Sequence, residues 1–337
     1  MSSVPGQEHV LTPLLAAAQK GRLTGCYVFE GPEGVGKKEA ARFIARAAAC
    51  ENELPESRPC DQCPTCHHMR KGTHPDLVEI GPDADKKTLT ISVKSAREVI
   101  RQIQLHRYAA RRRTFIIDPA DKMQPQAANA LLKTLEEPPD GTGFILVTHR
   151  ASSLLPTVLS RSQRVRFRML ALPTLTQNLE AQGLVDTARL ARLADGRPGW
   201  AQALLDGELE ALDEARSELL EILAASPKEL FDFSKKLRGK GGRISWQAKV
   251  ERYFDVIESL LRDATCHAAG RPDYLNSDRV DVIEAWAQAL YPHGIGRLQD
   301  ELKKARGRLE LNVTARLLME PLMAKLANEL GKARLIS

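Results

Sequence analysis

CYVFEGPEGVGKKEAARFIARAAAC (26–50) decides the fold, because it joins a short apolar run, a glycine-rich loop and an alanine-rich segment. CYVFEG (26–31) predicts a strand, and KKEAARFIARAAAC (37–50) predicts a helix with apolar residues on one side. A strand that leads through a glycine-rich loop into a helix is the context in which such a loop can hold a phosphate. The stretch therefore predicts an α/β module organised around this loop.

The loop GPEGVGKK (31–38) matches the phosphate-binding pattern of Gly, four residues, Gly, Lys and Ser or Thr at every position but the last. Gly31, Gly36 and Lys37 are in register, and Gly34 lies between them. The loop backbone and Lys37 can still surround a phosphate. Lys38 stands where the hydroxyl should be, and an ammonium group cannot ligate Mg²⁺ because it has no acceptor.

The first half of the chain alternates predicted strands and helices. The helices are SAREVIRQIQLHRYA (95–109), with Tyr108 on its apolar side, and QPQAANALLKTLEE (124–137), which two prolines end. Strands that alternate with helices favour one parallel sheet with helices on both faces. With the first strand this predicts a five-stranded sheet, whose other strands are DLVEIG (76–81), TFIID (114–118), GFILVTH (143–149) and QRVRFRML (163–170), the last alternating as an edge strand would.

Four of the six cysteines form a cluster, and Cys26 and Cys266 are isolated. Two-residue gaps let neighbouring sulfurs converge on one ion, and four thiolates complete a closed tetrahedral zinc shell with no open position for catalysis. The spacing therefore predicts a structural zinc ion, against the alternative of four reduced thiols without metal. His67 or His68 could replace one thiolate as a ligand. The predicted ligands are Cys50, Cys60, Cys63 and Cys66.

The bulk composition bounds the remaining choices. A chain of 337 residues favours two or three domains, and its formal net charge of +6 suits a polyanionic partner. The first residues have no basic stretch followed by an apolar core, and no run of 18 apolar residues occurs, so we expect a cytoplasmic protein with neither a secretory signal nor a membrane span. After about residue 170 the pattern becomes helical. We expect domains over 1–170, a small helical lid over 171–208 and an all-α domain over 209–337.

Several motifs occur in a fixed succession: GPEGVGK (31–37), the four cysteines, THPD (73–76), NALLKTLEEPP (129–139) and LPTVLSR (155–161). This succession resembles the clamp-loader branch of the AAA+ ATPases, densely over residues 6 to 168. The resemblance implies an AAA+ P-loop module with a zinc knuckle (50–66), a helical lid and a collar that assembles a ring. It also implies partners: clamp-loader subunits of the gamma/tau and delta types and, indirectly, the sliding clamp and primer–template DNA, with no membrane.

The resemblance also bears on catalysis. Active relatives end the third predicted strand in Asp-Glu, where the Glu polarises water, but here Asp118 is followed by Pro119. Together with Lys38 this removes two groups that ATP hydrolysis requires. We expect no intrinsic hydrolysis. Binding of ATP or ADP without turnover and an empty loop, kept for its turn geometry, are both open alternatives.

Arg161 matches the arginine that relatives present to ATP bound on a neighbouring subunit. Such a guanidinium neutralises charge that develops on the transferred phosphate. Ser162 replaces the cysteine of the family motif at a packing position. The alternative interpretation is an ordinary surface arginine at a helix end.

Two further positions match family sensors of the nucleotide. Thr148, at the end of the fourth strand, occupies the first sensor position, although a threonine there is also ordinary sheet structure. Arg197 in DGRPGW matches the second sensor only loosely. Asp118, Thr148 and the loop residues thus make up the degenerate nucleotide site predicted here.

Basic residues surround the start of the third predicted strand. RYAARRR (107–113) holds four arginines, and Lys94, Arg97 and Arg101 lie on the preceding helix. In a ring around duplex DNA such charges could follow phosphates without reading sequence. The alternative is a solvated charged face.

We therefore predict a clamp-loader subunit that acts as a stator: it does not hydrolyse ATP and supplies Arg161 to a neighbouring ATPase. Polymerase activity would belong to the whole holoenzyme. Two rival hypotheses are a catalytic clamp-loader ATPase of the gamma/tau type, opposed by Lys38 and Pro119, and a zinc-knuckle DNA-binding protein outside the replisome.

Overall fold

The computed structural model divides into two compact units, Met1–Ala201 and Gln202–Ser337. It describes residues 4–23, 25–82, 90–104, 108, 110–184, 186–225, 229, 232–233, 242–310 and 313–331. The division into three domains at 170 and 208 stays a prediction, and each unit is described by itself below.

The first unit is built on a parallel five-stranded sheet in the order β2-β3-β4-β1-β5. The predicted sheet is confirmed, and the alternating strand is an edge strand as expected. Residue Cys26 of β1 pairs with Ser162 of β5 and with Phe144 of β4, so these three strands run in register. The strands are β1 (Cys26–Glu30), β2 (Leu77–Ile80), β3 (Arg113–Ile117), β4 (Thr142–Thr148) and β5 (Ser162–Arg166).

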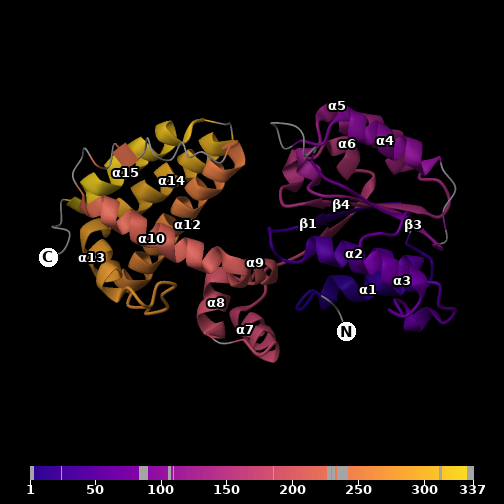
Figure 1. Ribbon diagram of the computed structural model, residues 1–337, viewed down its shortest axis with the longest axis horizontal. Coiled ribbons are helices and arrows are strands. Elements are labelled where there is room, and N and C mark those ends of the chain that lie inside the picture. Colours follow the sequence, from indigo (N-terminus) through magenta and orange to yellow (C-terminus); the bar gives the residue numbers. More distant parts are fainter. Residues whose placement is uncertain are drawn as a thin grey trace. The chain divides into compact units, whose positions relative to one another are not determined.

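Helices cover both faces of this sheet (Figure 1). Successive side chains of a strand point to opposite faces, so Phe29 packs with the helices of one face and Val28 with those of the other. One face carries α1 (Glu8–Gln19), α2 (Lys37–Ala49) and α3 (Pro64–Arg70), and the other carries α4 (Val93–Ile103), α5 (Pro125–Glu136) and α6 (Pro156–Leu159). The short 3₁₀ turns are η1 (Pro55–Ser57), η2 (Ala120–Lys122) and η3 (Ala151–Ser153).

The helix predicted over 95–109 ends earlier than expected. Helix α4 ends at Ile103, and Tyr108 is 78% exposed instead of lying on an apolar face. The reason is the buried carboxylate of Asp76, which accepts hydrogen bonds from the backbone N–H groups of Tyr108 and Ala110. The chain before β3 is thus held by a side chain from the segment that precedes β2, which helical periodicity cannot reveal.

Short helices complete the first unit and continue into the second. They are α7 (Leu172–Ala181), α8 (Thr187–Ala194) and α9 (Pro198–Ala203), with a π-helical turn η4 (Leu204–Glu208) after them. The helical character predicted for 171–208 is confirmed. Residues 198–201 belong to the first unit, where they contact the loop after β1.

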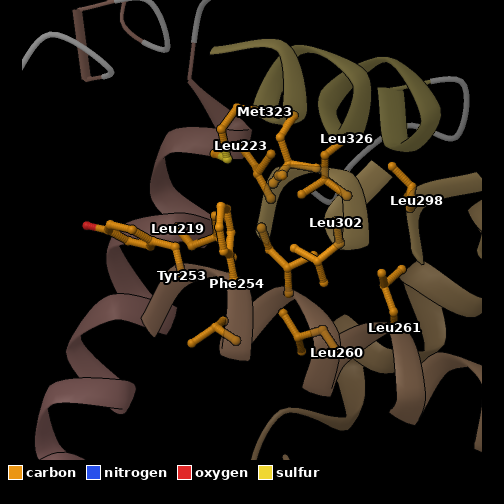
Figure 2. Close-up of a cluster of buried hydrophobic side chains, with 14 of the residues drawn as sticks. Leu219, Leu223, Tyr253, Phe254, Leu260, Leu261, Leu298, Leu302, Met323 and Leu326 are labelled. Atoms are coloured by element: carbon orange, nitrogen blue, oxygen red, sulfur yellow. The ribbon is translucent and has the colours of Figure 1, made fainter. Parts of the chain in front are cut away.

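The described part of the second unit is all helical, as predicted. It comprises α10 (Leu209–Ala224), α12 (Gly242–Ala268), α13 (Val280–Leu290), α14 (Gly294–Glu310) and α15 (Ala315–Gly331). The apolar side chains of α12 between Val250 and Leu261 are buried, with Tyr253 and Phe254 fully enclosed. Figure 2 shows them in one core with Leu219, Leu302 and Met323 from three other helices.

Within the described ranges, no helix is both long and apolar enough to cross a membrane.

Candidate functional site

The loop between β1 and α2 has the backbone conformation that its glycines predict. Gly31 and Gly36 have φ angles of 145° and 89°, a region that other residues rarely adopt. A Cβ on Gly31 would also collide with the carbonyl oxygen of Phe167. The loop therefore keeps its glycines for reasons of backbone geometry as well as for any ligand.

Two other segments of the first unit pack against this loop. The N–H of Gly199 donates to the carbonyl oxygen of Gly34 at 2.7 Å, and the backbone nitrogen of Trp200 would lie 3.2 Å from a Cβ on Gly34. On the other side, a Cβ on Gly36 would collide with the buried side chain of Val4. The loop is thus enclosed by the start of α9 and by the N-terminal segment.

Lys37 bonds to its own loop. Its Nζ donates to the carbonyl oxygen of Gly31 at 2.7 Å and also to that of Pro32. Only 6% of Lys37 is exposed, and this burial lowers the pKa of its ammonium group. Two loop carbonyls therefore satisfy the group that would otherwise contact a phosphate.

Lys38 pairs with the carboxylate that would support a metal ion. Its Nζ lies 3.4 Å from Asp118 Oδ2 and 3.6 Å from Glu79 Oε2. Burial raises the pKa of Asp118, and the neighbouring Lys38 ammonium opposes that rise. Glu79 also accepts a bidentate bond from Arg42, which holds the pKa of Glu79 below its usual range. A lysine cation thus already neutralises Asp118.

Thr148 is also bonded within the chain. Its Oγ1 donates to Asp121 Oδ1 at 2.7 Å and accepts from the N–H of Arg150 at 3.0 Å, and the residue is fully buried. Asp121 is therefore hydrogen-bonded to the end of the fourth strand, while Asp118 is paired with Lys38. The structure brings both carboxylates and both lysines to the carboxyl ends of the parallel strands, which is where ligand sites of such sheets lie.

Arg161 lies at the amino ends of the strands, and the loop lies at their carboxyl ends. Arg161 directly precedes Ser162, which pairs with Cys26 at the amino end of β1, whereas the loop follows Glu30 at the carboxyl end. Four steps of about 3.3 Å separate those two ends, or about 13 Å. Arg161 and the loop of this chain therefore do not meet at one site.

The Arg161 side chain is held at three points. Its Nε donates to Glu136 Oε1 at the end of α5, and its Nη1 donates to the carbonyl oxygen of Thr157 at 3.0 Å and to Ser160 Oγ at 3.4 Å. The side chain is still 38% exposed. Sequence reasoning missed Glu136, although the residue lies inside the motif NALLKTLEEPP, because nothing in one sequence ties that motif to LPTVLSR.

The four predicted cysteine ligands come together. The sulfurs of Cys50, Cys60, Cys63 and Cys66 all lie within 4.8 Å of one another. Sulfurs bound to a tetrahedral zinc ion at about 2.3 Å are about 3.8 Å apart, so the cluster fits such an ion with small adjustments. His67 and His68 are exposed on α3 and lie outside the cluster, so no histidine replaces a cysteine.

Local structure explains how the cysteines converge. Cys50 caps the end of α2 and Cys63 begins α3, where its sulfur accepts from the N–H of Cys66 at 3.4 Å. The sulfur of Cys60 accepts from the N–H of Cys63, and that of Cys50 from the N–H of Cys60. Burial raises the pKa of Cys60, but donors that include the N–H groups of Gln62 and Cys63 outweigh burial and lower it to about 6. Burial instead raises the pKa of Cys50 and of Cys66. Thiolates are the form that binds metal.

Two of the four arginines in the run 107–113 are structural. Arg112 is buried and donates to the carbonyl oxygen of Thr142, and Arg113 is buried in an ion pair with Asp76 at 2.8 Å. These two arginines cannot follow DNA phosphates, which corrects that part of the prediction. Arg111 is exposed and donates to the carbonyl oxygen of Glu51 at 3.2 Å. Arg107 lies outside the described residues.

The three basic residues predicted on α4 are all exposed. They are Lys94, Arg97 and Arg101, of which Arg101 also pairs with Glu98 in a bidentate contact. Arg197, the loosely matched sensor, bonds the carbonyl oxygen of Ala194 and packs over the ring of Trp200 beside the loop.

Comparison with known proteins agrees with these features. The model of the family described as DNA polymerase III, delta subunit, matches residues 6–171. The delta' subunit of DNA polymerase III from Bacillus subtilis is 28% identical over 338 residues, which covers 95% of this chain and 96% of that protein. The chain is therefore similar to a DNA polymerase III delta' subunit over nearly its whole length.

Tau subunits are similar over a shorter part of the chain. The tau subunit of Escherichia coli is 35% identical over 179 residues, 53% of this chain, and the chain spans only 27% of that protein. The chain spans 33% of the Salmonella typhimurium tau subunit. A solved structure of a gamma subunit-related protein from Thermotoga maritima covers 95% of the chain with a TM-score of 0.47 and 18% identity.

Proposed function

We propose that this chain is a clamp-loader subunit of the delta-prime type, a stator that does not hydrolyse ATP. In this role it provides Arg161 to ATP bound on a neighbouring subunit of the gamma/tau type, assembles with a delta-type subunit as well, and helps to load the sliding clamp onto primed DNA. The near full-length similarity to a delta' subunit supports this assignment over a tau subunit, of which the chain spans a small share.

The main support for this proposal is that Arg161 lies at the amino ends of the strands. The loop of the same chain lies at the carboxyl ends of the strands. The Arg161 guanidinium therefore cannot reach a triphosphate that is bound in the loop of its own chain. A guanidinium that reaches a phosphate on another subunit stabilises the charge that grows there during transfer. Its exposure and its fixed stem suit that use.

The loop itself supports the absence of turnover. Hydrolysis needs a hydroxyl and an acidic residue for Mg²⁺ and a group that orients water. Lys38 replaces the hydroxyl and pairs with Asp118, and Pro119 replaces the glutamate. Lys37 is satisfied by loop carbonyls. We infer that the loop is retained as a packing element between α2 and the start of α9.

We also propose that the cysteine cluster holds a structural zinc ion. The four residues are Cys50, Cys60, Cys63 and Cys66, whose sulfurs fill a tetrahedral shell completely, so the ion would join the end of α2 to α3. Lys94, Arg97 and Arg101, which also pairs with Glu98, are exposed basic residues on α4 that could contact the phosphates of primer–template DNA.

We expect the isolated chain to show no ATP turnover above background, because both catalytic substitutions lie in its own sequence. Lys38→Thr should restore the hydroxyl but no turnover, since Pro119 still offers no carboxylate. Any affinity for ATP should be the same in Mg²⁺ and in EDTA for the wild type, since the Lys38 cation already neutralises Asp118. The measurements are phosphate release and equilibrium binding of ATP.

Lys37→Ala is the control in the same assay. Phosphate release by the wild type that this substitution abolishes would mean that the loop is catalytic, and the chain would then be an ATPase of the gamma/tau type.

A further inference from the structure

The strongest feature that the proposed function does not use is the contact between Arg161 and Glu136. Glu136 is the last residue of α5, and Arg161 follows the short helix α6. The two side chains are each a little over one-third exposed and meet through Nε of the arginine. The contact joins two motifs that are 25 residues apart in the sequence.

The arrangement of donors on Arg161 is informative. A guanidinium has five N–H donors. Nε bonds Glu136, and Nη1 bonds the carbonyl oxygen of Thr157 and the hydroxyl of Ser160. Among the residues that the structure describes, Nη2 has no hydrogen-bond partner. The carboxylate therefore holds the inner side of the guanidinium and leaves an outer nitrogen available.

We propose that Glu136 is a positioning residue for Arg161, which fixes the guanidinium so that Nη2 can meet a phosphate on the neighbouring subunit; this rests on the proposed trans role of Arg161. A catalytic donor that is already oriented needs no reorganisation when the transition state forms. An arginine with a free stem samples several rotamers, and only some of these present the same nitrogen outward. Glu136 thus acts through Arg161 and does not itself contact the nucleotide.

An opposing role for Glu136, as a latch that withdraws the arginine, fits the contacts less well. A latch would engage the nitrogens that face the phosphate, whereas the carboxylate engages Nε on the stem side. An exposed ion pair is also weak, so it would restrain the arginine little against a triphosphate, but it suffices to bias a rotamer.

The test is a double-mutant cycle in the assembly reconstituted with its partner ATPases, measuring kcat and KM for ATP. Glu136→Gln should lower kcat roughly two- to fivefold, which is the scale of one exposed ion pair, and leave KM unchanged because the neighbour binds the nucleotide. In an Arg161→Ala background the same substitution should have no further effect. Glu137→Gln, the loss of the adjacent exposed carboxylate, is the matched control and should behave as wild type.

Each outcome separates the two proposals. If Arg161→Ala lowers kcat and Glu136→Gln does not, or raises it, the positioning role is wrong while the finger stands. If Arg161→Ala itself has no effect, the proposed function fails first. An equal effect of Glu136→Gln with and without Arg161 would place Glu136 in the structure of α5 alone and overturn the inference.

Discussion

Replacing Arg161 by alanine is expected to leave the reconstituted complex assembled and to slow ATP hydrolysis at the one site that Arg161 faces by about 10³-fold or more. The reason is the loss of a guanidinium at the charge that develops on the transferred phosphate. Assembly should persist because the side chain is partly exposed and its bonds are local to α5 and α6. Size-exclusion chromatography and phosphate release measure the two quantities.

Two matched variants sharpen this expectation. Arg161→Lys keeps the charge but lacks the planar fork, so most of the rate should still be lost. Arg168→Ala removes an exposed arginine seven residues later and should change neither assembly nor turnover. Unchanged turnover in Arg161→Ala would remove this residue from the mechanism. Loss of assembly would show instead that Arg161 is an interface residue.

The sheet could be predicted because strands β1 to β4 are short apolar runs next to turn signals, and β5 alternates as an edge strand does. Strands β1, β3 and β4 are buried on both faces, which gives the unbroken apolar sequences that parallel strands show. The cysteine cluster could be predicted because metal ligand sets depend on short spacings that the sequence displays directly. Both features are local in the chain.

Contacts between distant segments could not be predicted in the same way. The run of arginines at 111–113 indicates a basic patch. Arg113 is nevertheless buried, because it forms an ion pair with Asp76, 37 residues away in the sequence. The enclosure of the loop by Val4 and Trp200 likewise joins both ends of the first unit. A charged residue in sequence has no visible partner until the fold brings one to it.

One property of the degenerate loop could be predicted from a single residue, and another depends on a contact between distant segments. Lys38 in place of a hydroxyl predicts the loss of a magnesium ligand, and this follows from the residue alone. That the same lysine then neutralises Asp118 at 3.4 Å is a result of the fold. The pairing gives the partly buried carboxylate of Asp118 a cationic partner without a metal ion. The loop thus has a stable arrangement that needs no ligand.

Cys63→Ser is expected to abolish stoichiometric zinc and to destabilise the first unit, by an amount on the order of 5 kcal/mol. Structural zinc contributes about 10 kcal/mol or more in small domains that depend on it, but this unit also has apolar cores on both faces of its sheet, so part of the fold should remain. Cys63 is the sharpest choice because its sulfur also caps α3. Zinc content by atomic absorption and denaturant unfolding measure the two effects.

Amide hydrogen exchange of Cys63→Ser would locate the part of the first unit that loses stability. Exchange should accelerate at the end of α2 and throughout α3, which the four sulfurs join, while α12 and α13 in the second unit serve as an internal reference. Cys266→Ser, which removes a thiol from α12, should leave both zinc content and exchange near the cysteine cluster unchanged. A wild-type chain purified without zinc, or a Cys63→Ser chain of unaltered stability, would mean that the four thiols are packed without metal. The fold would then depend on the apolar contacts of α3, such as the buried Met69, to keep the segment in place.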